Sequence, residues 1–428
     1  MEALLIDGGR PLKGCIAISG SKNAALPILA ATVAHGAQYT ISRCPAITDV
    51  ALAGEIIEAL GGSVSRRGDT LRVDTRNVRR HAIPGSLMGR MRASVLFLGA
   101  LLTRFGAAAL TMPGGCPLGR RPIDLHLDAV ARMGTSVVLR EGSILCEAPA
   151  LHGAAIELLF PSVGATENVL LTAVGCGGTV VLQNAAREPE IEDLGRFLQA
   201  MGADIAGLGT DTITIRGGAP LHGASYTVMA DRIETATFLC ACAGCGGDVA
   251  LTGTDGKYIG PVLDALTDAG CEICRGRDTV TLRSEGRLRA VSEIATAPYP
   301  GFPTDVQAPM MAALLRARGE SRFAETIFER RFAHVAQLRK FGAEIEVVGA
   351  GATVRGVEAL RPALVEGTDL RGAASLVLAA LQAPGESAVT GIKHLRRGYD
   401  KLEEKLRALG ASICTGKNPT GNFPSDRV

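Results

Sequence analysis

A pattern of apolar and polar positions recurs along the whole chain: a helix end, a glycine, two residues, then Val or Ile. It appears as ALGGSV, RMGTSV, AMGADI, DAGCEI, KFGAEI and ALGASI, at Gly61, Gly134, Gly202, Gly270, Gly342 and Gly410. The intervals between these glycines are 73, 68, 68, 72 and 68 residues. A glycine between a helix and a strand is typical of a left-handed helix cap. The spacing predicts six structural repeats.

Each repeat has the same order of elements before its glycine. An Ala- and Leu-rich stretch, such as NAALPILAATV or SLVLAALQA, predicts a helix. A Gly-rich turn and a short β-branched strand follow, as in GGTVVL, and then a charged amphipathic helix, as in IEDLGRFLQAM. Each unit of about 70 residues therefore predicts strand, helix, strand, helix and paired strands. Six units grouped three and three predict an α/β protein with two halves of similar size.

Composition and net charge indicate which classes of partner the chain does not require. The chain has 428 residues and a net charge of +2, so neither nucleic acid nor a membrane surface is required as a partner. Residues 1–14 read as a strand and a turn rather than a signal peptide. The most apolar stretch, SVLFLGALLT, is too short to span a bilayer. We expect a cytoplasmic protein without nucleic-acid or membrane partners, and a frayed, aperiodic tail at 415–428.

The 11 cysteines are scattered and odd in number, which indicates reduced thiols. The segments CACAGC and CEIC hold Cys240, Cys242, Cys245, Cys271 and Cys274 without a histidine nearby. Free cysteine is among the most often buried residues. We interpret these five as small core side chains, and we expect no metal site.

Charged and polar residues gather at two phases of the repeat. One group lies at the start of the first helix: Lys22, Asn23, Arg92, Thr166, Glu167, Asp231, Arg232, Asp305, Asp369 and Arg371. A second lies where the second helix begins: Arg121, Arg187, Glu188, Lys257, Glu329, Arg331 and Arg397. Helix starts expose unpaired N–H groups and a positive dipole end, so they bind anions. The set indicates a multiply anionic substrate; the alternative is helix caps and surface ion pairs.

One cysteine differs from the others in its surroundings. Cys116 lies in MPGGCPLGRRPIDLH, where glycine and proline mark a loop and two arginines follow closely. Nearby positive charge lowers a thiol's pKa and favours the reactive thiolate. From this loop alone, a reactive and a structural role remain equally open.

The chain is similar over nearly its whole length to the UDP-N-acetylglucosamine 1-carboxyvinyltransferase family of enolpyruvyl transferases. The resemblance is carried, in order, by SGSKNAALPILAA, GGCPLGRRPIDLH, PSVGATENVLL, NAAREPEIEDL, YPGFPTDVQAPMMA, ETIFERRF, TDLRGAASLVLA and RRGYDKLEEKLRALGA. It implies two inside-out α/β domains of three repeats each, with the active site between them. The domains would be residues 22–229, and residues 1–21 with 230–428.

The resemblance also implies the reaction. The enolpyruvyl group of phosphoenolpyruvate moves to the 3-hydroxyl of UDP-N-acetylglucosamine with release of phosphate, the first committed step of peptidoglycan synthesis. The chemistry needs a proton donor at the methylene carbon, a base at the hydroxyl, and cations around a carboxylate and a phosphate. No cofactor is implied. UDP-N-acetylmuramate is implied as a feedback ligand.

Residue roles follow from the same resemblance. Cys116 resembles the general acid that also forms the covalent phosphoenolpyruvate adduct and reacts with fosfomycin. Asp305 resembles the base, and Asp369 and Arg371 resemble residues near the reacting centre. The phosphoenolpyruvate contacts would be Lys22, Asn23, Arg121 and Arg397. The UDP-N-acetylglucosamine contacts would be Arg92, Arg121, Pro122, Ile123, Asp124, Leu125, Ser162, Val163, Gly164, Asp305 and Ile327.

Of three alternatives, two would have a distinct sequence signature. A transferase that uses shikimate 3-phosphate would lack the cysteine loop and the uridine segment, both of which are present. A related enzyme acting on a nucleotide of secondary metabolism is not separated by sequence. An inactive binding protein would have lost the charged residues at the helix starts, whereas this chain retains them.

Overall fold

The computed structural model describes residues 2–114 and 123–417. These form two compact units, which are described separately below. The N-terminal unit contains residues 20–114 and 123–229, and the C-terminal unit contains residues 2–19 and 230–417. The resemblance led us to expect boundaries at 21/22 and 229/230.

The N-terminal unit has three inner helices, each the first helix of a repeat: α1 (Lys22–Ala31), α4 (Phe97–Phe105), which follows the 3-10 helix η1 (Arg92–Leu96), and α6 (Val163–Ala173). The other helices are α2 (Thr48–Ala59), α3 (Gly85–Met88), α5 (Asp124–Arg132) and α7 (Pro189–Ala200). The first sheet has the order β13 (Ser225–Thr227), β3 (Gln38–Ser42), β5 (Thr70–Asp74) and β4 (Ser63–Arg67). The second is β6 (Ala107–Thr111), β8 (Ser143–Glu147) and β7 (Ser136–Arg140). The third is β11 (Asp204–Ala206), β12 (Thr212–Arg216), β10 (Thr179–Gln183) and β9 (Ala155–Glu157).

The C-terminal unit repeats this plan with inner helices α8 (Arg232–Cys245), α10 (Thr304–Ala313) and α12 (Leu370–Gln382). The other helices are η2 (Gly256–Ile259), α9 (Gly260–Asp268), η3 (Leu314–Arg316), α11 (Val335–Leu338), η4 (Arg339–Phe341), η5 (Leu395–Arg397) and α13 (Leu402–Ala408). Its first sheet is β15 (Glu272–Arg275), β16 (Thr279–Ser284), β14 (Gly247–Thr252) and β2 (Leu12–Ala17). The second is β17 (Ile294–Ala295), β18 (Glu320–Ala324), β20 (Gly351–Arg355) and β19 (Glu344–Val348). The third is β21 (Leu364–Glu366), β22 (Gly385–Thr390), β1 (Glu2–Gly8) and β23 (Ser412–Lys417).

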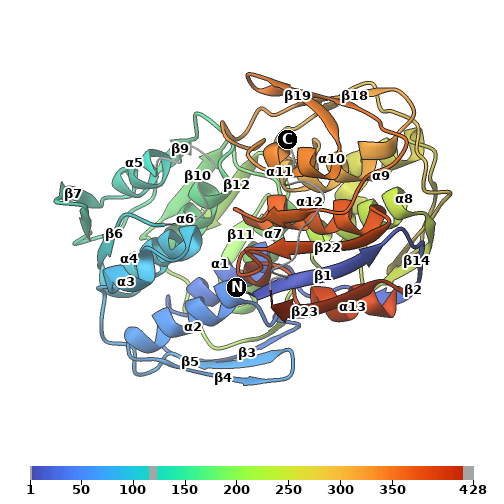
Figure 1. The fold of residues 1–428 in the computed structure, drawn as a ribbon. Coiled ribbons are helices and arrows are strands. Elements are labelled where there is room, and N and C mark those ends of the chain that lie inside the picture. Colours follow the sequence, from blue (N-terminus) through green and yellow to red (C-terminus); the bar gives the residue numbers. More distant parts are fainter. Residues whose placement is uncertain (1, 115–122, 418–428) are drawn as a thin grey trace. The chain divides into compact units, whose positions relative to one another are not determined.

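The inner helices form the cores. All residues of α12 are buried, as are those of α8 up to Gly244. A helix that is apolar on every side must lie inside, and α10 packs against both α8 and α12 (Figure 1). The sheets pack outside with one face toward the helices, so their residues alternate between buried and exposed, as in β12. This arrangement, with helices inside and sheets outside, is the inside-out fold that we expected.

The six repeat glycines have the predicted conformation. Their φ angles are +108°, +95°, +106°, +103°, +86° and +88° from Gly61 to Gly410. Residues with a Cβ rarely adopt such angles, so glycine is needed where the chain leaves a helix and turns into a strand. The sequence pattern therefore located the turn in all six repeats.

The N-terminal strands belong to sheets formed mainly by distant parts of the chain. β2 runs parallel to β14, and β1 lies antiparallel between β22 and β23. Figure 1 shows the blue β1 among the red strands of this sheet. In the same way β13, from the end of the N-terminal unit, pairs in parallel with β3.

The predicted frayed tail begins too early. Residues 415–417 belong to β23, where Thr415, Gly416 and Lys417 pair with Leu4, Ala3 and Glu2. Backbone hydrogen bonds can form without a pattern of apolar side chains. The strand at 415–417 was therefore not predicted from the aperiodic sequence. Residues 418–428 lie outside the described residues.

The cysteine prediction holds for most of the five residues. Cys240, Cys242 and Cys271 are buried, and Cys245 is half-buried. Cys274 is exposed, because β15 is an edge strand and this side chain lies on its outer face. Within the described ranges, no three His, Cys, Asp or Glu side chains are grouped to hold a metal ion. No helix in the same ranges has the length and apolarity to cross a bilayer.

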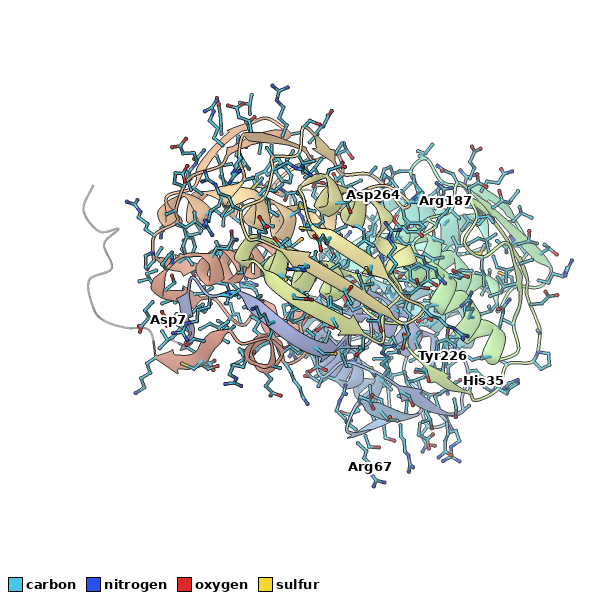
Figure 2. The ribbon with its side chains drawn as sticks, turned by 90° about the vertical axis from the view of Figure 1, so that its right-hand side faces the viewer. Asp7, His35, Arg67, Arg187, Tyr226 and Asp264 are labelled. Atoms are coloured by element: carbon cyan, nitrogen blue, oxygen red, sulfur yellow. The ribbon has the colours of Figure 1, made fainter. Side chains whose placement is uncertain are left out.

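A buried carboxylate anchors the last segment of the N-terminal unit. Asp193 of α7 accepts hydrogen bonds from the Tyr226 hydroxyl at 2.8 Å and from the Met229 N–H at 3.1 Å. Tyr226 is labelled in Figure 2. Burial raises the pKa of Asp193 to about 6, while these two hydrogen bonds act in the opposite direction. The ionised carboxylate is therefore disfavoured in the folded protein.

This shift predicts a pH-dependent stability. The folded-state pKa of Asp193 lies above its ordinary value of 3.8. Its contribution to the free energy of unfolding is therefore greatest below pH 3.8 and is lost as the pH rises through 6. Asn does not titrate. The free energy of unfolding of Asp193→Asn, taken relative to that of the wild type, should therefore rise by up to about 3 kcal/mol between pH 4 and pH 7. Urea unfolding across this range measures the difference, with exposed Asp204→Asn as the control. A difference that is constant with pH would contradict the prediction.

Candidate active site

The C-terminal unit brings one carboxylate and two buried arginines together. Asp305 lies in the first turn of α10. Its Oδ1 is 2.7 Å from Nη2 of Arg331, and its Oδ2 is 2.8 Å from Nη2 of Arg371. The arginine side chains are 3% and 4% exposed, whereas that of Asp305 is 27% exposed. The cluster carries one net positive charge and reaches solvent through the carboxylate.

Both arginines are held from several directions. Arg331 also donates from Nε and Nη2 to the carbonyl of Thr304, and its guanidinium stacks over Phe328. Arg371 stacks over Tyr399, whose hydroxyl is 2.9 Å from that of Thr237. These contacts fix each planar guanidinium, the geometry that suits recognition of a carboxylate.

Neighbouring groups keep the Arg371 guanidinium protonated. Burial by itself would lower the pKa of Arg371, but Asp305, Tyr399 and Asp231 together raise it above its ordinary value. The guanidinium therefore remains charged although it is buried. A preorganised buried cation interacts strongly with an anion, because little water screens it.

Asp369 and His334 lie beside this cluster. Oδ1 of Asp369 caps α12 by accepting the N–H groups of Arg371 at 3.1 Å and Gly372 at 3.0 Å. Nδ1 of His334 is 3.1 Å from the carbonyl of Arg331, which requires that Nδ1 carries the proton. Burial lowers the pKa of His334 to about 4, so the ring is neutral at physiological pH.

A second carboxylate holds the turn that contains Ile327. Glu325 accepts hydrogen bonds from the Thr304 hydroxyl and from the N–H groups of Ile327 and Phe328. This network joins the turn to the start of α10. Ile327, expected to contact the nucleotide, therefore lies in a segment tied to the residue that precedes Asp305.

Arg397 lies in η5, which packs against α12. The adjacent Arg396 forms a two-point ion pair with Glu2 of β1, at 2.8 and 3.0 Å. This pair ties the short helix to the sheet behind it. Arg396 therefore has a partner of its own at the surface of the unit.

In the N-terminal unit, the expected residues lie at helix starts. Lys22 and Asn23 begin α1 after the cap Ser21, and the Lys22 ammonium is 2.7 Å from Asp49. Arg92 begins η1, which packs against α1. These residues therefore lie on adjoining elements of one unit.

Two groups of the expected UDP-sugar residues adjoin each other within the N-terminal unit. Ser162 caps α6, which begins with Val163 and Gly164. A Cβ on Gly164 would approach His126 of α5 within 2.8 Å, and Nδ1 of His126 is 2.8 Å from the Asn168 amide. This close packing brings the start of α6 to the start of α5. The start of α5 holds Ile123, Asp124 and Leu125, the described part of the segment that was expected to hold the uridine.

Glu167 is a buried acid in the first turns of α6. Burial raises its pKa well above the ordinary value, and Glu190 and Glu188 raise it further. This environment favours the protonated acid.

The expected site residues can now be compared with their positions in the structure. It brings together Asp305, Asp369 and Arg371, and it adds Arg331 and His334, which were not among the expected site residues. Arg331 stood in the second group of charged positions, so its phase in the repeat was the available signal. Cys116, Arg121 and Pro122, three of the expected site residues, lie outside the described residues.

The comparisons with known proteins agree with this architecture. The profile of the EPSP synthase family (3-phosphoshikimate 1-carboxyvinyltransferase) matches residues 6–406. The UDP-N-acetylglucosamine 1-carboxyvinyltransferase of Halorhodospira halophila is 46% identical over 96% of this chain and 99% of its own. The enzyme of the same name from Paracoccus denitrificans is 45% identical over 96% of this chain and 98% of its own.

Solved structures extend the comparison. The enolpyruvyl transferase NikO from Streptomyces tendae is 30% identical, with a TM-score of 0.88 over 98% of this chain and 99% of its own. EPSP synthase from Acinetobacter baumannii is 17% identical, with a TM-score of 0.73 over 97% of this chain and 100% of its own, and shows the shared fold. The chain therefore belongs to the EPSP synthase family and, within it, to the UDP-N-acetylglucosamine 1-carboxyvinyltransferases.

Proposed function

We propose that this enzyme transfers the enolpyruvyl group of phosphoenolpyruvate to the 3-hydroxyl of UDP-N-acetylglucosamine and releases phosphate. The observation that carries the proposal is the identity of 46% over nearly the full chain to an enzyme of that name. The reaction is the first committed step of peptidoglycan synthesis. It takes place in the cytoplasm, in agreement with ten described cysteines that are free thiols.

The site residues have complementary roles in this reaction. The Cys116 thiol gives its proton to the methylene carbon of phosphoenolpyruvate, and the sugar 3-oxygen bonds to the neighbouring carbon. Asp305 takes the proton from that oxygen. Departure of phosphate and return of one methyl proton to the Cys116 thiolate then restore the double bond in the product. All three proton transfers use groups on this chain rather than a cofactor.

Charge recognition supports the same substrate. Phosphoenolpyruvate has a carboxylate and a phosphate, and two fixed guanidiniums suit the former. Arg331 and Arg371 already hold one carboxylate, that of Asp305, and they are the candidates for the substrate's carboxylate. Lys22, Asn23, Arg121 and Arg397 are the proposed contacts for the phosphate end.

UDP-N-acetylglucosamine is the proposed acceptor, bound by Arg92, Arg121, the segment 122–125 and the turn at 162–164, with Asp305 and Ile327. The UDP-sugar relatives support this choice, whereas the family profile carries the name of a shikimate 3-phosphate enzyme. UDP-N-acetylmuramate, which retains the nucleotide, is proposed as a feedback ligand at the same contacts.

Comparing acceptors tests the function. Phosphate release from phosphoenolpyruvate should occur with UDP-N-acetylglucosamine and stay at background level with shikimate 3-phosphate, because only the former has the uridine diphosphate that these residues would bind. Chromatography of the nucleotide product verifies that the enol ether has formed. Release with shikimate 3-phosphate alone would overturn the assignment.

A further inference from the structure

A lysine expected at the phosphate end is already paired with a carboxylate. Lys22 is the first residue of α1, and Asp49 lies in the first turn of α2. The two helices pack together, and Nζ of Lys22 is 2.7 Å from Oδ2 of Asp49. The Asp49 side chain is 3% exposed and that of Lys22 is 13% exposed. The carboxylate therefore lies on the buried side of the ammonium.

Stability alone is a weak reason for such a pair. Burying two charges costs desolvation energy that their attraction often only balances, and apolar side chains can replace such pairs without loss. The same helix α2 also forms an ordinary surface pair, between Glu55 and Arg90, which are 43% and 48% exposed. The buried pair differs because its lysine begins an inner helix, where N–H groups and the helix dipole already favour an anion.

We infer that Asp49 is a positioning residue that orients the Lys22 ammonium and limits how tightly the site holds phosphate. The inference rests on the proposed function, in which Lys22 contacts the phosphate. Asp49 fixes Nζ from behind, so this cation needs little reorganisation when charge shifts toward the departing phosphate. The negative charge of Asp49 also repels the phosphate dianion, so the product leaves more readily.

Asp49→Asn separates these two effects from a structural role. Without the carboxylate, inorganic phosphate should inhibit about tenfold more strongly, as expected for removing one charge a few ångströms away. The ammonium also loses its fixed partner, so kcat should fall about tenfold or more. KM for phosphoenolpyruvate should fall with kcat. A purely structural role predicts lower stability, a higher KM for both substrates and no gain in phosphate inhibition.

A second variant and a matched control complete the experiment. Asp49→Glu keeps the charge but moves it, so kcat should fall while inhibition by phosphate stays at the wild-type level. Glu234→Gln breaks the comparable buried pair between Glu234, 2% exposed, and Lys405, 14% exposed. It should lower the thermal unfolding midpoint without altering phosphate inhibition. If Asp49→Asn does not fold, Asp49→Glu still distinguishes charge from position.

The assay follows formation of the enol ether by chromatography, with inorganic phosphate as the added inhibitor. Wild-type enzyme without turnover of UDP-N-acetylglucosamine would refute the proposed function. Normal wild-type turnover with unchanged or weaker phosphate inhibition of Asp49→Asn would overturn only the role of Asp49. Stronger phosphate inhibition of Asp49→Asn together with lower kcat would support it.

Discussion

Asp305→Asn should lower turnover by about 10²-fold or more, in line with typical contributions of a general base. The amide keeps the size of the side chain and its hydrogen bonding but cannot take a proton from the sugar hydroxyl. It also leaves Arg331 and Arg371 without the charge that now lies between them. The site would therefore gain one net positive charge as it loses its base.

The loss of the base and the gain of positive charge should change kcat and KM in different ways. We expect kcat to fall strongly, while KM for phosphoenolpyruvate stays unchanged or falls, because two unpaired guanidiniums attract its carboxylate. UDP-N-acetylglucosamine should still bind, with reduced affinity. Steady-state kinetics and calorimetry measure these effects. Asp264→Asn is the control, because Asp264, which is labelled in Figure 2, forms an exposed pair with Arg275. Near-normal turnover would show that Asp305 is not the base.

Cys116 should be the preferred target of thiol reagents, and fosfomycin-type epoxides should add there. Arg120 and Arg121 follow it closely in the sequence, and nearby positive charge favours the thiolate. Burial raises the pKa of Cys146, Cys176 and Cys271 to about 11 and that of Cys245 to about 12, so these thiols react slowly. Burial also raises the pKa of Cys240 and Cys242.

Peptide mass mapping after brief treatment tests this selectivity. The competing exposed thiols are Cys15, Cys274 and Cys414. Cys116→Ser should abolish both the epoxide adduct and the covalent phosphoenolpyruvate adduct, whereas Cys274→Ser should keep both. Modification spread evenly over the exposed cysteines would contradict the proposed reactivity of Cys116.

Local patterns predicted the repeats well. The apolar stretch that became α12 indicated an inner helix, and the glycine at 410 indicated the turn that follows α13. Both signals arise within a few residues of the chain, where helix propensity and φ preferences act. They did not indicate that β1 would lie between β22 and β23, because strand pairing between distant segments has no local signature.

The same difference between local signals and long-range contacts applies to the site. The phase of the repeat placed Asp305 and Arg371 at helix starts, but it did not show that their side chains meet. The Asp305 carboxylate joins Arg331, 26 residues away, and Arg371, 66 residues away. The contact with Arg331 joins the two helix starts of one repeat, and the contact with Arg371 joins it to the next repeat. The sequence pattern encodes neither, because both contacts depend on how these elements pack in space. His334 was missed because a single buried histidine carries no periodic signal.

The position of β1 has a consequence for synthesis on the ribosome. β1 is made long before its neighbours β22 and β23, which follow it in the sequence by nearly the whole of both units. Residues 20–229 can complete their own core while the remainder is still being translated. During that interval both edges of β1 lack their partners, and unpaired edges invite association with other chains. Slow translation, or truncation before residue 385, should therefore promote aggregation through the N-terminal strand rather than through the completed N-terminal unit.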